Sequence, residues 1–183
     1  MKLTEYGVHC LIVYPDMNTL RMIYSYYAKM QLEDNNGIVL IIPYYETTEM
    51  VRSVLSGENN NNQSNIIDVR KYEKQGSLMI IDSVKAYLRS DIDLMSYLAR
   101  LAKHAQFSGK KGISVIADLA SFYYNDQSDR LIEYEMSLPT KYDDNMKLKG
   151  FCFYHQVDFD RRLTEQQKQM LLEHHGKNLM VVT

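Results

Sequence analysis

The chain has 183 residues, a length typical of one domain whose core folds without help from a disulfide or a metal ion. Its net charge of −2 disfavours a non-specific nucleic-acid binder, because such proteins carry a basic excess. No apolar stretch approaches the roughly 18–20 residues that cross a bilayer, and the short polar N-terminus does not resemble a signal peptide. We therefore expect a cytoplasmic protein without membrane or direct nucleic-acid partners.

Short apolar segments alternate with segments of helical periodicity along the chain. The first apolar segment, residues 8–14 (VHCLIVY), stops at Pro15, and Asp16 or Asn18 caps the helix that follows and ends near Asn36-Gly37. Further predicted strands are residues 38–42, 78–81, 112–117, 151–154 and 178–182. Further predicted helices are residues 47–57, 68–74, 91–107, 128–138 and 164–175. The polar segment 58–65 (ENNNNQSN) is predicted to be a mobile loop.

This alternation predicts an α/β fold with three layers, in which helices cover both faces of a mostly parallel sheet. The whole chain, residues 1–183, is predicted to be a single domain. Ligands of such sheets bind at the carboxyl ends of the strands. The polar and aromatic residues predicted at those ends are Tyr14, Asp16, Asp118, Tyr154 and His155.

The turn after the first strand argues against nucleotide hydrolysis. A P-loop uses glycines to wrap phosphate with backbone N–H groups, a lysine for the β/γ-phosphates and a Ser/Thr for magnesium. Residues 14–22 read YPDMNTLRM, without glycine or lysine, and Asp16 places a carboxylate where the phosphate would lie. Asp118 ends a strand as a magnesium-binding aspartate would, but a turn residue, a helix cap or a polar group of a pocket are alternatives.

Histidine and cysteine residues on the first and fifth predicted strands give a weak indication of a metal site. The candidates are His9, Cys10, Cys152 and His155. Because a strand rises ~3.3 Å per residue, His155 lies about 10 Å beyond Cys152, so one ion does not easily gather all four. We expect buried free thiols and no metal or cofactor. Thiols that line a ligand pocket, or a redox pair with Cα atoms within ~7 Å, are alternatives.

Two helices carry further titratable residues to which we assign structural roles. His174 and His175 fall in the last turn of the final predicted helix, where histidine favours the negative end of the helix dipole. Glu133 and Glu135 are two residues apart and face different directions, so they do not form a carboxylate pair for acid–base catalysis.

Several segments, in order, resemble the MEDS domain, the methanogen/methylotroph, DcmR-type sensory domain. They are His9–Tyr14, Gly76–Leu78, Asp118–Phe122, Leu131–Glu135, Cys152–Tyr154 and the late histidine at His174. The resemblance spans about residues 7–182. It implies a RecA/KaiC-like domain without nucleotide chemistry that senses small hydrocarbon-like compounds and signals through a DNA-binding or histidine-kinase module. His155 departs from the aspartate common in the family, and the signalling partner is expected in trans.

The leading hypothesis is a non-catalytic sensory module with a small-molecule ligand. The expected ligand-binding residues are Tyr14, Asp16, Asp118, Tyr154, His155, Cys10 and Cys152. One alternative is a protein-interaction or homo-oligomerisation module, in which Tyr24, Tyr26 and Tyr27 face a partner. The other is a divergent nucleotide binder or enzyme.

Overall fold

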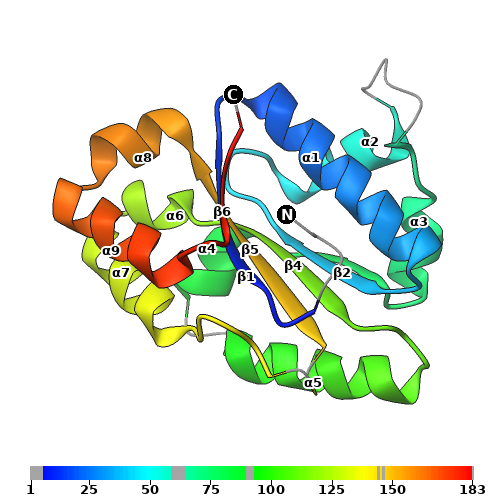
Figure 1. The fold of residues 1–183 in the computed structure, drawn as a ribbon. Coiled ribbons are helices and arrows are strands. Elements are labelled where there is room, and N and C mark those ends of the chain that lie inside the picture. Colours follow the sequence, from blue (N-terminus) through cyan, green and yellow to red (C-terminus); the bar gives the residue numbers. More distant parts are fainter. Residues whose placement is uncertain (1–5, 59–64, 90–92, 144, 146, 183) are drawn as a thin grey trace.

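Six parallel strands form one sheet in the order β3-β2-β4-β5-β1-β6 (Figure 1). The computed structural model describes residues 6–58, 65–89, 93–143, 145 and 147–182. The strands are β1 (His9–Tyr14), β2 (Ile38–Ile42), β3 (Leu78–Ile80), β4 (Ile113–Asp118), β5 (Leu148–His155) and β6 (Leu179–Val181). The pairings that join these strands are all parallel, which confirms the predicted α/β sheet.

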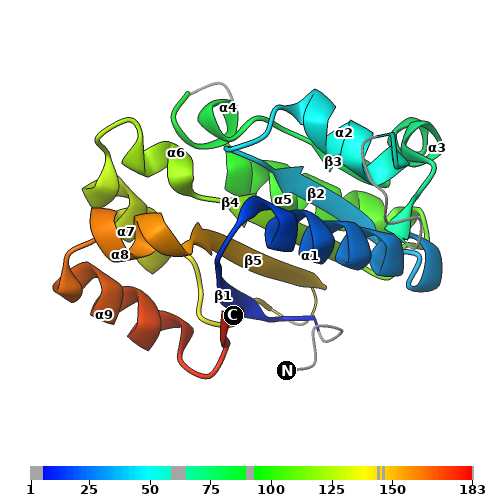
Figure 2. The ribbon, with the colours of Figure 1, turned by 90° about the horizontal axis from the view of Figure 1, so that it is seen from above.

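Helices cover both faces of the sheet and complete the predicted three layers (Figures 1 and 2). One face packs against α1 (Met17–Lys29), which continues into a π-helical turn (Met30–Asp34), and against α2 (Thr48–Ser56) and α3 (Val69–Lys74). The other face packs against α4 (Ser83–Tyr87), α5 (Leu94–Phe107), α6 (Ala120–Tyr123), α7 (Ser128–Ser137), α8 (Gln156–Arg162) and α9 (Glu165–His175). We call these the α1 face and the α5 face.

Successive residues of the inner strands alternate between the two cores. Leu11 and Val13 of β1 pack on the α5 face, whereas Cys10 and Ile12 pack on the α1 face. Since β1 and β5 are in register with Leu11 beside Cys152, that cysteine also faces α5. The register therefore decides which side chains of these two strands can meet.

The predicted helix ends at Asp16 and Thr164 are confirmed. The Asp16 carboxylate accepts a hydrogen bond from the Thr19 N–H at 2.9 Å, and Thr164 forms a capping box with Gln167. The helices α4, α6 and α8 were not predicted, because four to seven residues show too little periodicity. Residues 59–64 of the predicted loop and 90–92 near the predicted start of α5 lie outside the described residues.

Strand β5 begins three residues earlier than predicted, since Gly150 continues the strand instead of preceding it. A side chain at Gly150 would place its Cβ 2.7 Å from the Tyr142 hydroxyl, so the glycine makes room for this ring.

Among the described residues, no helix is both long enough and apolar enough to cross a membrane.

Gly112, which precedes β4, provides a test of the register between β4 and its neighbours. Its φ is +152°, and a Cβ would lie 2.3 Å from the Lys147 carbonyl oxygen. We expect Gly112→Ala to lower the free energy of unfolding by about 3 kcal/mol. The control Gly109→Ala has a φ of +68° but nothing within 4 Å, so its cost is about 1 kcal/mol of backbone strain. Urea unfolding measures both, and equal losses would contradict the close approach.

Candidate functional site

Several of the residues predicted at the strand ends meet between β1, β4 and α8. We define the strand-exit site as Tyr14, Tyr45, Asp118, Tyr123 and Asp158. Asp158 accepts a hydrogen bond from the Tyr45 hydroxyl and another from the Tyr124 hydroxyl at 3.3 Å. The imidazole of His155 lies 3.7 Å from the same carboxylate, and its ring centroid is 5.4 Å from that of Tyr14. The site therefore combines two acids with several aromatic rings.

Asp118 is buried at the end of β4 and acts partly as a helix cap. Its Oδ1 accepts a hydrogen bond from the Ala120 N–H at 3.0 Å, at the start of α6. Burial raises the pKa of this carboxyl to about 7, although backbone N–H groups of Ala120, Tyr44 and Tyr45 work in the opposite direction. Asp118 can therefore hold a proton near neutral pH, which an exposed aspartate does not.

Two buried hydroxyl groups of the strand-exit site have no hydrogen-bond partner among the described residues. The Oη atoms of Tyr14 and Tyr123 are enclosed, and neither forms a hydrogen bond with any residue that the structure describes. The charge of Asp118 raises the pKa of both phenols after the larger effect of burial, which places the three groups within electrostatic reach of one another. Since buried polar groups are normally hydrogen-bonded, these two hydroxyls are available to a polar atom of a water molecule or a ligand.

An apolar pocket adjoins Asp118 on the α1 face. Its lining residues are Leu20, Tyr24, Ile41, Ile42, Pro43, Tyr45, Glu46, Ile116, Asp118 and Phe153. It has room for about one water molecule. A larger molecule therefore requires a neighbouring side chain such as Tyr45 to move.

Asp16 lies on the exposed side of this region as the N-cap of α1. Its carboxylate accepts the Thr19 N–H, and this hydrogen bond lowers the pKa of Asp16. A helix N-terminus of this kind binds phosphate in P-loop proteins, because its free N–H groups favour an anion. Here a side chain of the chain itself supplies the anion.

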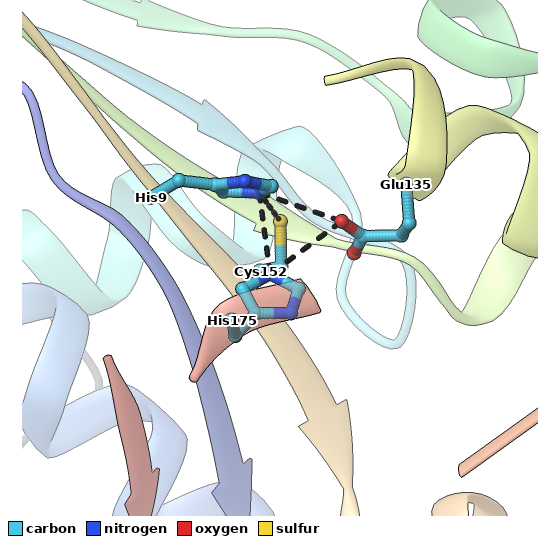
Figure 3. A group of neighbouring side chains, drawn as sticks. All are labelled: His9, Glu135, Cys152 and His175. Atoms are coloured by element: carbon cyan, nitrogen blue, oxygen red, sulfur yellow. Dashed lines mark hydrogen bonds and ion pairs between the residues drawn. The ribbon is translucent and has the colours of Figure 1, made fainter. Parts of the chain in front are cut away.

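A second group of functional side chains lies buried on the α5 face, nearer the start of β1 (Figure 3). It consists of His9 from β1, Glu135 from α7, Cys152 from β5 and His175 from α9, and we call it the four-residue cluster. All four are buried, and the potential ligand atoms lie within 4.8 Å of one another. His9 Nε2 is 3.3 Å from Cys152 Sγ and 3.4 Å from Glu135 Oε2.

Backbone contacts fix the orientation of both imidazoles in the four-residue cluster. His9 Nδ1 lies 3.1 Å from the Pro139 carbonyl oxygen, and His175 Nδ1 lies 2.8 Å from the Leu171 carbonyl oxygen. A carbonyl oxygen only accepts, so each Nδ1 carries the proton and donates it. Each Nε2 then faces the cluster, and the two Nε2 atoms are 3.3 Å apart.

Glu135 is held by groups on both of its oxygen atoms. Tyr154 donates its hydroxyl proton to Oε1, while His9 and His175 face Oε2. Burial acts to raise the pKa of Glu135, but the hydrogen bonds and charges of these neighbours prevail and lower it. Burial raises the pKa of Cys152 and lowers that of His175, so the protein environment alone favours a neutral thiol and a neutral imidazole.

The structure separates the residues that the sequence placed in one ligand site. Tyr14, Asp118 and His155 do come together at the strand exits. Tyr154 instead turns to Glu135 on the α5 face, and Asp16 caps α1. Of the weak metal candidates, His9 and Cys152 meet, but His155 lies near Asp158. Cys10, the remaining metal candidate, packs on the α1 face.

Sequence reasoning missed Glu135 and His175 as members of a cluster. Apart from its place in the Leu131–Glu135 segment of the family resemblance, Glu135 was compared with Glu133 alone, and His175 was assigned to the helix dipole. A usable signal existed, because each residue follows a buried leucine by four positions, Leu131 and Leu171. Residues four apart share a helix face, so both side chains belong to the buried face. Nothing in the sequence indicated that the two faces meet.

Cys10 and Cys152 are predicted not to form a disulfide in the folded protein. They lie on neighbouring strands, but their side chains point to opposite faces of the sheet, a geometry that a disulfide cannot bridge. Mild oxidation should leave the mass of the folded chain unchanged, and thiol titration in denaturant should still count both cysteines. A loss of two protons under native conditions would contradict this arrangement.

Comparisons with known proteins agree with the fold. A search of curated proteins finds no match. Among solved structures, the chain is similar to a KaiC-like protein from the hyperthermophilic archaeon Pyrococcus horikoshii OT3, with a TM-score of 0.56 and 12% sequence identity. That likeness covers 91% of this chain and 70% of the other, and it shows the RecA/KaiC-like fold. Residues 8–175 match the MEDS family, described as the methanogen/methylotroph, DcmR Sensory domain. The chain therefore belongs to the MEDS family of sensory domains.

Proposed function

We propose that this domain is a non-catalytic sensory module that binds a small, partly apolar molecule at the strand-exit site. The observation that carries the proposal is the pair of buried hydroxyls of Tyr14 and Tyr123, which lack partners among the described residues and lie near Asp118. Membership of a sensory family supports a binding role. A few polar groups within an aromatic and apolar surround are typical of small-molecule sites.

The chemistry of the site favours a neutral ligand with one polar group. An anion is disfavoured by Asp118, Asp158 and Glu46, whose charges all raise the pKa of Tyr14. The tyrosine hydroxyls can donate to or accept from a polar atom, and a protonated Asp118 can donate as well. An apolar body would contact Ile116 and Phe153 in the adjoining pocket. A small hydrocarbon derivative, the class that the family resemblance implies, fits these requirements.

Binding would be communicated by the tyrosines that close the site. Tyr45 is hydrogen-bonded to Asp158 of α8, and Tyr44 stacks on Tyr124 with ring centroids 5.4 Å apart. Because the pocket holds only about one water molecule, a ligand must displace such side chains. Their movement would change the surface near α6 and α8, where a signalling partner supplied in trans can read it.

The alternatives have weaker support. Asp16 places a carboxylate at the helix N-terminus that a phosphate would need, which argues against a divergent nucleotide binder. Of the tyrosines on α1 expected to face a partner, Tyr24 and Tyr27 are buried and only Tyr26 is exposed. The protein-interaction alternative therefore loses the surface that the sequence suggested for it.

A paired stability and binding experiment tests the strand-exit site. Tyr14→Phe removes a buried hydroxyl that has no partner among the described residues, so we expect the free protein to gain about 1 kcal/mol of stability. The same variant should bind ligand about three- to tenfold more weakly, since it loses one hydrogen bond to it. Thermal shifts across a panel of small alcohols, ketones and halogenated hydrocarbons identify the ligand, because a ligand raises the melting temperature with concentration.

The matched control for this experiment is Tyr26→Phe, which changes an exposed tyrosine on α1 and should alter neither quantity. A panel without any stabilising compound would count against the sensory proposal. So would a magnesium-nucleotide that stabilises the protein and is turned over, or a concentration-dependent dimer as the species that carries the stability. A loss of stability in Tyr14→Phe would show that the hydroxyl has a partner within the protein.

The pH dependence of stability tests the environment of Asp118. Its pKa is near 3.8 when unfolded and about 7 when folded, so the folded state binds the proton more tightly between these values. Stability contributed by this group is therefore present at low pH and lost as pH rises through that window. Asp118→Asn does not titrate, so its stability relative to wild type should rise from about pH 4 to about pH 8.

Asp16→Asn is the control with the opposite sign. The pKa of Asp16 is lowered by its hydrogen bond to the Thr19 N–H, so its charged form stabilises the fold, and the asparagine should be equal or slightly worse at neutral pH. Urea unfolding across the pH range measures both variants. A flat difference curve for Asp118→Asn would show that the carboxyl is not perturbed.

A further inference from the structure

We propose that the four-residue cluster is a metal site for a divalent transition-metal ion of the Zn²⁺ class. It lies at the opposite end of β1 from Tyr14 and does not depend on the ligand proposed for the strand exits. The donors are two imidazole nitrogens, one thiol sulfur and one carboxylate oxygen. This mixture of nitrogen, sulfur and oxygen donors suits zinc better than magnesium or calcium, which prefer oxygen alone.

The spacing of the donor atoms fits a tetrahedral ion. Metal–ligand distances of about 2.0–2.3 Å correspond to tetrahedral edges of about 3.3–3.7 Å. The His9 Nε2 atom lies 3.3 Å from Cys152 Sγ, 3.4 Å from Glu135 Oε2 and 3.3 Å from His175 Nε2. The edge between His175 Nε2 and Glu135 Oε2 is 3.6 Å. These four edges match the ion, whereas the two edges from Cys152 Sγ to Glu135 and to His175 are at most 4.8 Å, so ion binding would involve adjustment of the thiol side chain.

In the tautomers that His9 and His175 adopt, the lone pairs of their Nε2 atoms point toward each other. Both Nδ1 atoms donate to backbone carbonyls, so each neutral imidazole presents an unprotonated Nε2 to the cluster. The Glu135 carboxylate also offers only acceptor electron pairs. A cation among these groups converts their mutual repulsion into coordination. The Nδ1–H to carbonyl contact is also the usual outer-shell interaction of a metal-bound histidine.

The charge balance supports the same conclusion. An ion that binds releases the Cys152 thiol proton to solvent, and the divalent ion with the resulting thiolate and the Glu135 carboxylate forms a neutral centre, so no net charge is left in the core. Four protein ligands fill a tetrahedral shell and leave no open position, which is typical of a structural rather than a catalytic zinc site. The ion would join β1, β5, α7 and α9, and it would tie together residues 166 positions apart in the chain.

The surface offers a route to the cluster. An open groove is lined by Tyr6, Val8, Lys141, His174, His175 and Asn178, among others. His175 thus belongs both to the groove and to the cluster, and rotation of its ring would admit an ion without opening the sheet. His174 lines the same groove, but its ring lies 5.6 Å from that of His9 and it is not a member of the cluster.

The competing explanation is a hydrogen-bonded network that shares protons. In that case the Cys152 thiol donates to His9, and one imidazole is protonated opposite Glu135. Both explanations use the same contacts, so the experiment must detect the ion directly. The chain offers two matched controls, because Cys10 is a buried cysteine on the other face and His174 is the neighbour of His175.

The test loads the tag-free protein with Zn²⁺ or Co²⁺ in competition with a chromophoric chelator. We expect one ion per chain, a tetrahedral Co²⁺ spectrum with a thiolate-to-cobalt band, and a melting temperature that falls when a chelator removes the ion. Cys152→Ser should abolish the thiolate band, and His175→Ala should weaken binding by more than about a hundredfold. Cys10→Ser and His174→Ala should keep both the band and the affinity.

Glu135→Gln and Tyr154→Phe distinguish a loss of metal binding from a loss of folding. The glutamine keeps the size of the side chain and loses the charge, so it should fold and bind the ion weakly. Tyr154→Phe removes the hydroxyl that orients Glu135, and we expect about 10–100-fold weaker binding with the thiolate band retained. Folded wild-type protein that binds neither ion, or an octahedral cobalt spectrum without a thiolate band, would overturn the proposal. Equal losses in the Cys10 and Cys152 variants would do the same.

Discussion

The register between β1 and β5 is the constraint on which both sites depend. Leu11 pairs with Cys152 and Tyr14 with His155. This pairing determines which side chains of the two strands lie on the same face of the sheet. This register brings His9 to Cys152 on the α5 face and Tyr14 to His155 at the strand exits. If β5 shifted by one residue, its side chains would move to the opposite face, and Cys152 would no longer lie on the same face as His9. The continuous apolar sequence of both strands does not by itself prevent such a shift, so the polar contacts help to specify it.

Helices α7 and α9 supply the other two residues of the four-residue cluster, Glu135 and His175. Each contributes a buried polar residue four positions after a buried leucine, and the two helices pack against each other. The cost of burying Glu135 and His175 is offset by His9 opposite them, by the Tyr154 hydroxyl that donates to Glu135 and by the Leu171 carbonyl that accepts from His175. The cluster therefore ties the packing of two helices to the pairing of two strands. The Tyr142 ring, for which Gly150 leaves room, also lies beside the cluster, with its centroid 5.6 Å from that of His9.

The sequence predicted the three layers and the succession of strands and longer helices along the chain, and it predicted the sites only in part. Continuous apolar runs ended by Pro15 and Pro43 identify buried parallel strands, because both faces must then be covered. Asp118 and Tyr14 were placed correctly at strand ends, since that inference needs only the direction of each strand. We expected Cys10 and Cys152 to bind the same ligand, but side chains alternate across the sheet, so the two cysteines face opposite sides of it. Glu135 and His175 could not be joined to His9 from sequence, because this contact depends on how two distant helices dock.

Glu135 and Asp118, two of the buried acids, differ in the groups that surround them. Glu135 is opposed by two imidazoles and a tyrosine hydroxyl, and their combined effect lowers its pKa despite complete burial. Asp118 is opposed mainly by backbone N–H groups and has Asp158 nearby, so burial prevails and its pKa rises. The donor atoms around Glu135 lie within 4.8 Å of one another, so an ion bound among them would give this carboxylate a positive partner. A carboxyl that takes up a proton near neutral pH suits a neutral ligand, so the same sheet can support an ion centre at one end and recognition at the other.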